Sequence, residues 1–265
     1  MTQIGMSDQS DERRQQFETE ALRIVDAAKE KGLVLRLLGS LAFRLHCPEY
    51  GYLQKQLGRA YTDIDYAGYG AQASKMAPLL IALGYREDAE INLLYAGQRM
   101  IFNNNGLGIH TDIFFDKLSF CHDIVWKNRL EDDYPTIPLA EMLMEKMQIV
   151  KINAKDLKDT IILLLEHPPA EHHETESLDE SYLGRLLGAD WGFYHTVTEN
   201  LKKVIDYMRQ EPFLEAGQME MVERNAKALL ARLAEAPKTV KWKLRAKIGT
   251  KVKWYQDVEE TGQIY

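Results

Sequence analysis

The hydrophobic pattern of the chain changes at residues 131–138, and this change limits the folds that the chain can adopt. Before it, short apolar runs of strand length alternate with helical patterns. After Pro135 and Pro138, the apolar residues recur only at the three- and four-residue spacing of amphipathic helices. The sequence therefore predicts an α+β fold, with an N-terminal mixed β-sheet flanked by helices and a C-terminal helical domain.

The expected elements follow from this spacing and from the glycines and prolines that interrupt it. A first helix covers residues 17–28 and ends before Gly32, and Pro48–Arg59 is expected to be a loop or a short insertion. The expected domains are residues 15–134, a helical domain at 135–236 and a tail at 237–265. The expected strands are 33–38, 62–67, 91–95, 98–103 and 107–115, and the other expected helices are 41–45, 71–83, 139–152, 157–166, 182–187, 198–209 and 219–233.

The composition excludes several classes of protein. The chain has 265 residues, of which 45% are hydrophobic, so it can bury a core without disulfides. Its two cysteines, Cys47 and Cys121, cannot form a disulfide framework. The N-terminus has no apolar segment of a signal peptide, and no apolar run approaches the ~20 residues of a membrane span. We expect a soluble, cytoplasmic protein without a membrane partner.

Three carboxylates and a Gly-Ser pair form the most informative pattern. Asp63 and Asp65 alternate with apolar residues in one expected strand, so their side chains point to the same face. Asp112 lies in another alternating stretch and could bring a third carboxylate from a neighbouring strand. Parallel carboxylates are oxygen ligands for Mg²⁺, and three of them can hold two metal ions about 3.5–4 Å apart. Gly39-Ser40, between a strand and a helix, would offer backbone amides and a hydroxyl to a phosphate.

Each part of this pattern also has an ordinary explanation. A single Asp-x-Asp on a strand is usually a solvated face, and a Gly-Ser turn after a strand is common. The two together, in this order, favour a catalytic site. Asp116 shares the strand face of Asp112 and is the second candidate for the third carboxylate, although capping the strand end is its simpler role.

The order Leu-Leu-Gly39-Ser40, Asp63-Ile-Asp65 and Asp112 resembles the DNA polymerase β-like nucleotidyltransferase superfamily. Within it, the chain is most similar to minimal bacterial nucleotidyltransferases, including abortive-infection type IV toxins and lincosamide and aminoglycoside nucleotidyltransferases. The toxins have a basic residue before Asp-x-Asp, a later lysine and a Lys-Asp-x-x-Asp element. The matching residues are Arg59, Lys146 and Lys155-Asp156-Leu-Lys-Asp159. The resemblance covers about residues 30–165.

This resemblance implies a nucleotidyltransferase-type sheet and Mg²⁺-dependent transfer of a nucleoside monophosphate from an NTP to a hydroxyl acceptor. It implies that Asp63 and Asp65 bind two Mg²⁺ or Mn²⁺ ions, and that Asp112 binds the catalytic metal and helps to deprotonate the acceptor. Gly39 and Ser40 would hold the β- and γ-phosphates. It also implies Arg59 and Lys146 as triphosphate contacts, each with a surface ion pair as the alternative. One departure is that 22 residues separate Ser40 from Asp63, more than in the family; an insertion at 48–58 explains it if this segment is a surface loop.

The acceptor of the transferred group has three alternatives. It is an RNA such as tRNA, a protein, or a small molecule of the antibiotic type. A different class of function is a catalytically silent module that binds nucleotide or RNA. An antitoxin-like protein is a further partner that the resemblance brings with it.

The C-terminal segment has an unusual charge. Residues 238–253 carry seven basic side chains and no acidic one, although the whole chain has a net charge of −7. Lysines interleaved with Trp242 and Trp254 would suit RNA binding, through phosphate contacts and base stacking. The alternative is a tail that folds back onto an acidic body.

Two further groups are assigned mainly structural roles. The histidines at 167, 172 and 173 lie in a polar loop without a recognised zinc-ligand spacing. Trp191 and Tyr194 are expected to pack in the core rather than to stack on bases.

Overall fold

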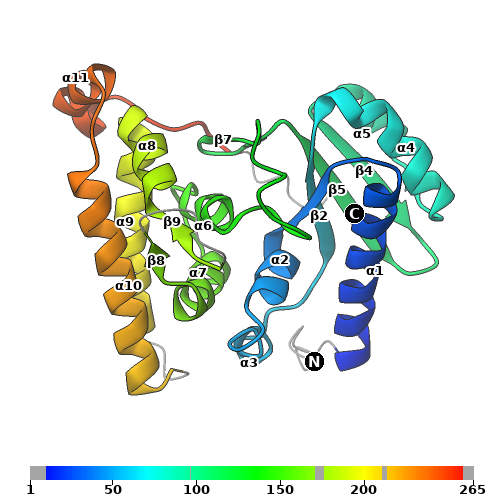
Figure 1. Cartoon of the computed structure of the whole chain (residues 1–265), viewed down its shortest axis with the longest axis horizontal. Helices are drawn as coiled ribbons and strands as arrows, with labels where there is room; N and C mark the ends of the chain where they lie inside the picture. The colour runs from blue at the N-terminus through cyan, green and yellow to red at the C-terminus, as the bar shows by residue number, and fades with distance from the viewer. Residues whose placement is uncertain (1–9, 96, 171–175, 211–213, 259–265) are drawn as a thin grey trace, which may run out of the picture. The chain divides into compact units, whose positions relative to one another are not determined.

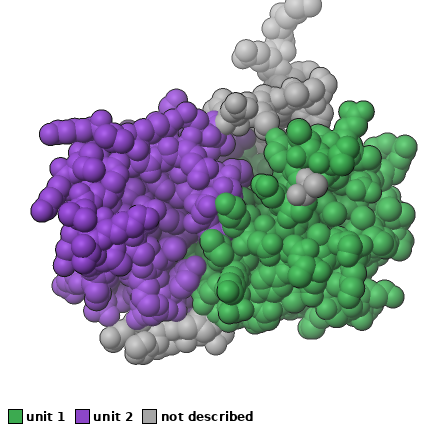
Figure 2. Space-filling view, turned by 90° about the horizontal axis from the view of Figure 1, so that it is seen from above, with its two compact units in different colours: residues 1–118, 125–142 green, residues 119–124, 143–265 purple. Residues whose placement is uncertain are grey.

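The computed structural model describes residues 10–95, 97–170, 176–210 and 214–258. The chain divides into two compact units, which Figure 2 distinguishes by colour. Unit 1 comprises residues 1–118 and 125–142, and unit 2 comprises residues 119–124 and 143–265. The main division thus falls after residue 142, compared with 134 in the sequence prediction, and the basic segment 238–253 belongs to unit 2.

Unit 1 is built around a five-stranded mixed sheet in the order β1-β2-β5-β4-β3. Figure 1 labels its strands β2, β5 and β4. Strands β2 and β5 run parallel, and the other neighbouring pairs run antiparallel. This confirms the predicted mixed sheet flanked by helices. The strands are β1 (Leu35–Leu38), β2 (Asp63–Gly68), β3 (Arg86–Glu87), β4 (Arg99–Asn104) and β5 (Ile109–Phe115).

One face of the sheet is apolar because alternate residues of every long strand point to it. Ile64 and Tyr66 of β2 and Ile113 of β5 are completely buried there. The Tyr66 hydroxyl donates to the carbonyl of Ala21, so the first helix covers this face. That helix, α1 (Asp11–Glu30), begins at Ser10, whose hydroxyl accepts a hydrogen bond from the Arg13 amide. The opposite face carries the aspartates of β2.

The remaining elements of this part of the chain are short. The β1 strand leads directly into α2, and α4 follows a 3₁₀ turn. Strands β6 and β7 form a separate two-stranded sheet. The elements are α2 (Gly39–His46), α3 (Leu53–Gln56), η1 (Gly70–Gln72), α4 (Ala73–Ala82), α5 (Ala89–Leu94), β6 (Lys117–Ser119), β7 (Asp123–Val125) and α6 (Leu139–Met147).

The predicted strand at 91–95 is wrong, because this segment is the helix α5. The Asp88 carboxylate accepts a hydrogen bond from the Ile91 amide and so caps the helix, a local effect that overrides the apolar run. Leu93 and Leu94 are 80% and 75% exposed, so the run does not signal burial.

The segment 48–58 is not a simple surface loop. It contains α3, where Leu53 and Gln54 are buried. The Gln54 amide donates to the carbonyl of Ser40 at 3.0 Å and accepts from the Tyr61 hydroxyl at 3.0 Å. The insertion is therefore anchored to the first turn of α2.

Unit 2 is almost entirely helical. Helices α7, α8 and α9 each pack against α10, and β8 and β9 form a short parallel pair before α8. Asn200 holds the end of α6 through hydrogen bonds to the carbonyls of Met147 and Ile149. The elements are α7 (Ala154–Glu166), β8 (Pro169–Ala170), β9 (Leu178–Asp179), α8 (Glu180–Ala189), α9 (Trp191–Met208), α10 (Ala216–Glu235), α11 (Val240–Ile248) and η2 (Gly249–Lys251).

His122 is buried in unit 2 as a neutral side chain. Its ring stacks on Phe193 with 4.8 Å between centroids, and its Nε2 lies 2.9 Å from the Thr196 hydroxyl. Burial lowers the pKa of His122 to about 4, against the weaker opposing effect of Asp190 and Asp123. In the unfolded chain the pKa returns to about 6.5.

This difference predicts a loss of stability in acid. Between pH 6.5 and pH 4, His122 is protonated in the unfolded chain but neutral in the folded chain. The contribution of His122 to stability is therefore fully present above pH 6.5 and is lost as the pH falls toward 4. At pH 5 the cost from His122 is about 2 kcal/mol. Urea unfolding measures how far the free energy of unfolding drops from pH 7 to pH 5. This drop should be smaller in His122→Gln than in the wild type by about this amount. An equal drop in the two proteins would contradict the assignment.

Candidate active site

The three predicted carboxylates lie on the polar face of the unit 1 sheet. In the parallel pair β2–β5, Asp65 is directly opposite Asp112, and Asp63 is opposite His110. Residues directly opposite each other share a face, so all four side chains project to the same side. The structure thus brings together the Asp-x-Asp of β2 and the third carboxylate of β5.

Gly39 lies against this row of carboxylates. Leu38 is paired with Asp65, and the next residue, Gly39, turns the chain into α2. Its φ is +73°, and a Cβ there would be 2.7 Å from Oδ2 of Asp65. Only glycine meets both conditions, the left-handed backbone and the close approach. Ser40 follows in the first turn of α2, whose N-terminus has no side-chain cap.

Arg99 binds Asp112 from the neighbouring strand β4. Its Nε donates to Oδ1 and its Nη2 to Oδ2, each at 2.8 Å, so one guanidinium occupies both carboxylate oxygens. The same guanidinium lies over the Phe114 ring, 5.2 Å from its centroid. This is the bidentate geometry of a strong, charge-assisted pair.

His110 is the second basic neighbour of Asp112. Its Nε2 is 3.6 Å from Oδ2 of Asp112, and its Nδ1 is 2.8 Å from Oδ1 of Asn103. Contact with Asp112 raises the pKa of His110, against the effect of burial. Burial alone would raise the pKa of Asp112, but His110 and Arg99 outweigh it, so this pKa is lowered. Asp112 is therefore a buried carboxylate stabilised as an anion.

Arg99, His110 and Asn103 are functional candidates that sequence reasoning missed. A signal existed, because His110 is two residues before Asp112 on the same strand face. Arg99 and Asn103 of β4 could be identified as neighbours of the site only from the β4–β5 register, in which Asn103 is opposite His110 and Ile101 is opposite Asp112. The Asn-Gly turn between these strands indicates a hairpin, but it leaves open the loop length that sets this register.

The donor chemistry of the three aspartates fits a divalent cation. Asp63 and Asp65 are partly exposed and present oxygen ligands, the type that Mg²⁺ prefers. Among the described residues, however, Asp63, Asp65 and Asp112 do not bring one oxygen each to within 4.8 Å of one another. Asp112 is instead directed to Arg99. Asp63 and Asp65 are thus the residues placed to hold a metal first.

Asp116 has a structural role in the turn after β5. Its Oδ1 accepts a hydrogen bond from the Gly70 amide at 3.0 Å, and its own amide donates to the carbonyl of Gly68. It thus ties the end of β5 to the end of β2, in agreement with its simpler role. Asp112, and not Asp116, is the carboxylate directly opposite Asp65.

The two predicted triphosphate contacts lie in different units. Arg59 of unit 1 is partly exposed, and its carbonyl accepts a hydrogen bond from Arg14. Lys146 of unit 2 is largely buried and its ammonium is surrounded by carboxylates, with Glu145 at 3.1 Å. Asp156 and Asp159 are 3.7 and 3.6 Å from it, so the Lys-Asp-x-x-Asp element forms an ion-pair cluster with this lysine.

The basic segment belongs to unit 2, where it packs on aromatic side chains of α9 rather than on acidic residues. Trp242 packs edge-on against Tyr194, and Trp254 packs edge-on against Trp191 and donates to the Thr196 hydroxyl at 3.0 Å. Both tryptophans are therefore committed to the surface of α9. The lysines at 241, 243, 247, 251 and 253 remain exposed.

His167 is the predicted loop histidine that lies among the described residues. His167 is buried, with Nδ1 3.0 Å from the carbonyl of Glu176 and 3.5 Å from its carboxylate. The histidines at 172 and 173 lie outside the described residues.

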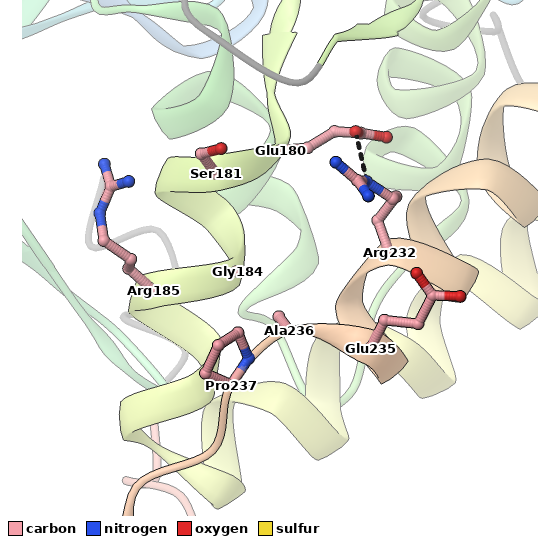
Figure 3. A pocket seen from close by; sticks show the side chains of 8 residues that line it. All are labelled: Glu180, Ser181, Gly184, Arg185, Arg232, Glu235, Ala236 and Pro237. Atoms are coloured by element: carbon pink, nitrogen blue, oxygen red, sulfur yellow. Dashed lines mark hydrogen bonds and ion pairs between the residues drawn. The ribbon is translucent and has the colours of Figure 1, made fainter.

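Unit 2 also has a pocket of about 410 Å³ between α8 and the end of α10 (Figure 3). Arg232 donates to Glu180 across it at 2.9 Å. Gly184 forms its floor, where a Cβ would approach that of Ala236 to 3.0 Å. Because its charged side chains are of both signs and two of them are paired, the pocket indicates no class of ligand.

Comparisons with models of protein families, with curated proteins and with solved structures gave no match to this chain. Across the described residues, none of the helices combines the length and the apolar character needed to span a bilayer.

The geometry at Gly39 predicts a specific effect of a methyl group. Gly39→Ala should destabilise unit 1 by about 2 kcal/mol or more, because strain and the contact with Asp65 both act. Gly58→Ala is the matched control, since Gly58 has φ +67° but no atom within 4 Å of a new Cβ. Urea unfolding should give the larger loss for Gly39→Ala, and equal losses would show that Asp65 is not in contact with Gly39.

Proposed function

We propose that the protein is a Mg²⁺-dependent nucleotidyltransferase that moves a nucleoside monophosphate from an NTP to a hydroxyl acceptor. The observation that carries this proposal is the pairing of Asp65 with Asp112 on parallel strands, with Gly39 against Asp65. A structural role does not account for three acidic side chains on one face of a small sheet. The resemblance to the DNA polymerase β-like superfamily is the second support, and the sheet is of the nucleotidyltransferase type in this proposal.

In this proposal the residues have separate tasks. Asp63 and Asp65 would hold the divalent ions, and Asp112 would bind the catalytic ion and help to deprotonate the acceptor hydroxyl. Gly39 permits the β1–α2 turn to approach the carboxylates, so the first amides of α2 and the Ser40 hydroxyl can bind the β- and γ-phosphates. Bound Mg²⁺ or Mn²⁺ would neutralise phosphate charge in the transition state. Catalysis is then mainly positioning and electrostatic stabilisation.

Arg59 and Lys146 remain the proposed triphosphate contacts. For Lys146 this requires that the ammonium exchange part of its carboxylate cluster for phosphate oxygens.

A catalytically silent nucleotide-binding module is the second candidate function, and one observation favours it. Both oxygens of Asp112 are bound by Arg99, so the third carboxylate is engaged by the protein itself. The two functions differ in the consequence of metal and nucleotide binding. A silent module binds the NTP but forms no pyrophosphate.

The exposed lysines of residues 238–253 favour RNA among the acceptors, ahead of proteins and small antibiotic-type molecules. Since Trp242 and Trp254 pack on α9, base stacking on them is not part of the proposal. RNA would be held by phosphate contacts, which depend strongly on salt and little on sequence. An antitoxin-like protein partner stays a prediction of the resemblance.

The nucleotide site predicts thermal stabilisation. An NTP with Mg²⁺ at 100 times its dissociation constant should add about 2.7 kcal/mol to the free energy of unfolding, a melting shift of about 5 °C or more. Asp63→Asn/Asp65→Asn should lose the Mg²⁺-dependent part of this shift. Glu90→Gln removes an exposed acidic charge on α5 and should keep it. No shift with any of the four NTPs in the wild type would contradict the proposed site.

The basic segment predicts a salt-dependent interaction with RNA. Replacing Lys241, Lys243 and Lys247 by glutamine should weaken tRNA binding and reduce the slope of log K against log salt by about 2. The control replaces three exposed lysines elsewhere in unit 2 and should leave the slope unchanged: Lys151, Lys202 and Lys227. Equal slopes for wild type and both variants would make the segment purely structural.

A further inference from the structure

We propose that Arg99 is an internal cation for Asp112, and that a divalent metal chelates this carboxylate only by displacing the guanidinium. The inference rests on the proposed function, because it takes Asp112 as a metal ligand. It adds a positioning residue to that site and assigns an order of events: Asp63 and Asp65 bind metal first, and Asp112 joins after Arg99 has moved.

The first argument is the completeness of the Arg99–Asp112 contact. Two hydrogen bonds of 2.8 Å engage one lone pair of each oxygen, so the pair of positions that a chelating metal would use is taken while the fork is in place. The Asp112 side chain is 7% exposed, which restricts water as a substitute partner. An ammonium on a lysine could neutralise the charge but could not occupy both oxygens in one plane.

The second argument is the local charge. Asp65 lies opposite Asp112, and Asp63, two residues before Asp65 on the same strand, is on the same face of the sheet. Without a cation, burial of Asp112 beside these carboxylates would be unfavourable. Arg99 supplies one positive charge where a metal-bound enzyme has a divalent ion. The charge of Asp112 is therefore balanced, and its carboxylate is held in place, before metal arrives.

The third argument is that Arg99 has a path out of the contact. Its side chain is 28% exposed, four times the fraction for Asp112, and its guanidinium already lies over Phe114 and within 6.0 Å of the Tyr95 ring centroid. These aromatic faces can retain the cation after it leaves Asp112. A nucleotide triphosphate would offer it a second acceptor, so metal together with nucleotide should displace it more readily than metal alone.

The test is the binding of Mn²⁺, followed by electron paramagnetic resonance without nucleotide and without any activity measurement. Arg99→Gln should bind Mn²⁺ about tenfold more tightly than wild type or better, because a charge-assisted competitor is removed. Arg99→Gln/Asp112→Asn should lose this gain, since the freed carboxylate is what provides it. Arg86→Gln changes an exposed arginine on β3 and should match the wild type.

The outcomes separate this inference from the function on which it rests. If Arg99→Gln leaves Mn²⁺ affinity unchanged or weaker, while Asp63→Asn/Asp65→Asn abolishes binding, the metal site stands and the role of Arg99 is overturned. If wild type and Arg99→Gln both fail to bind Mn²⁺, with or without NTP, both proposals fall.

A folding control keeps the test decisive. Circular dichroism should show that each variant is folded. If Arg99→Gln is not folded, Arg99→Lys takes its place, because lysine keeps the positive charge but cannot make both hydrogen bonds. The Mn²⁺ affinity of Arg99→Lys should exceed that of the wild type, and an equal affinity would overturn the inference.

Discussion

Electrostatic repulsion among the carboxylates of β2 and β5 is the constraint that the polar face of the sheet has to balance. The parallel register puts Asp65 beside Asp112, and the period of the strand adds Asp63 to the same face. The structure balances them with one arginine from β4, one histidine from β5 and a glycine that leaves room for Asp65. The β1–α2 turn, the β4–β5 pairing and the anchored insertion at α3 all serve this arrangement.

Much of the fold could be predicted from the sequence, because the periodicity of long segments reflects burial. Four of the five expected strands and the helical second half are present. The exception, α5, depends on the cap at Asp88 and on leucines that stay exposed, which periodicity cannot reveal. The segment after residue 237 was expected as a tail; it forms α11 and η2, because Trp242, Trp254 and Arg245 pack on aromatic side chains of α9.

The residues of the candidate site likewise divide into those that the sequence predicts and those that it does not. The alternation around Asp63, Asp65 and Asp112 predicts their common face from local sequence alone. Arg99 could not be identified from this alternation, because its contact with Asp112 joins two strands of a hairpin whose exact loop length the sequence leaves open. Lys146 shows a further limit: the sequence marks it as basic and near a helix end, but not that three carboxylates surround it.

The central claim is that these carboxylates support transfer of a nucleoside monophosphate. The most direct measurement follows label from NTPs that carry ³²P at either the α- or the γ-phosphate, with Mg²⁺ and total RNA, protein extract or small hydroxyl compounds as acceptors. The account predicts that α-label, and not γ-label, becomes attached to one acceptor class, and that Asp63→Asn/Asp65→Asn abolishes this. Transfer of γ-label, or no transfer of α-label to any acceptor by a protein that binds the NTP, would contradict it.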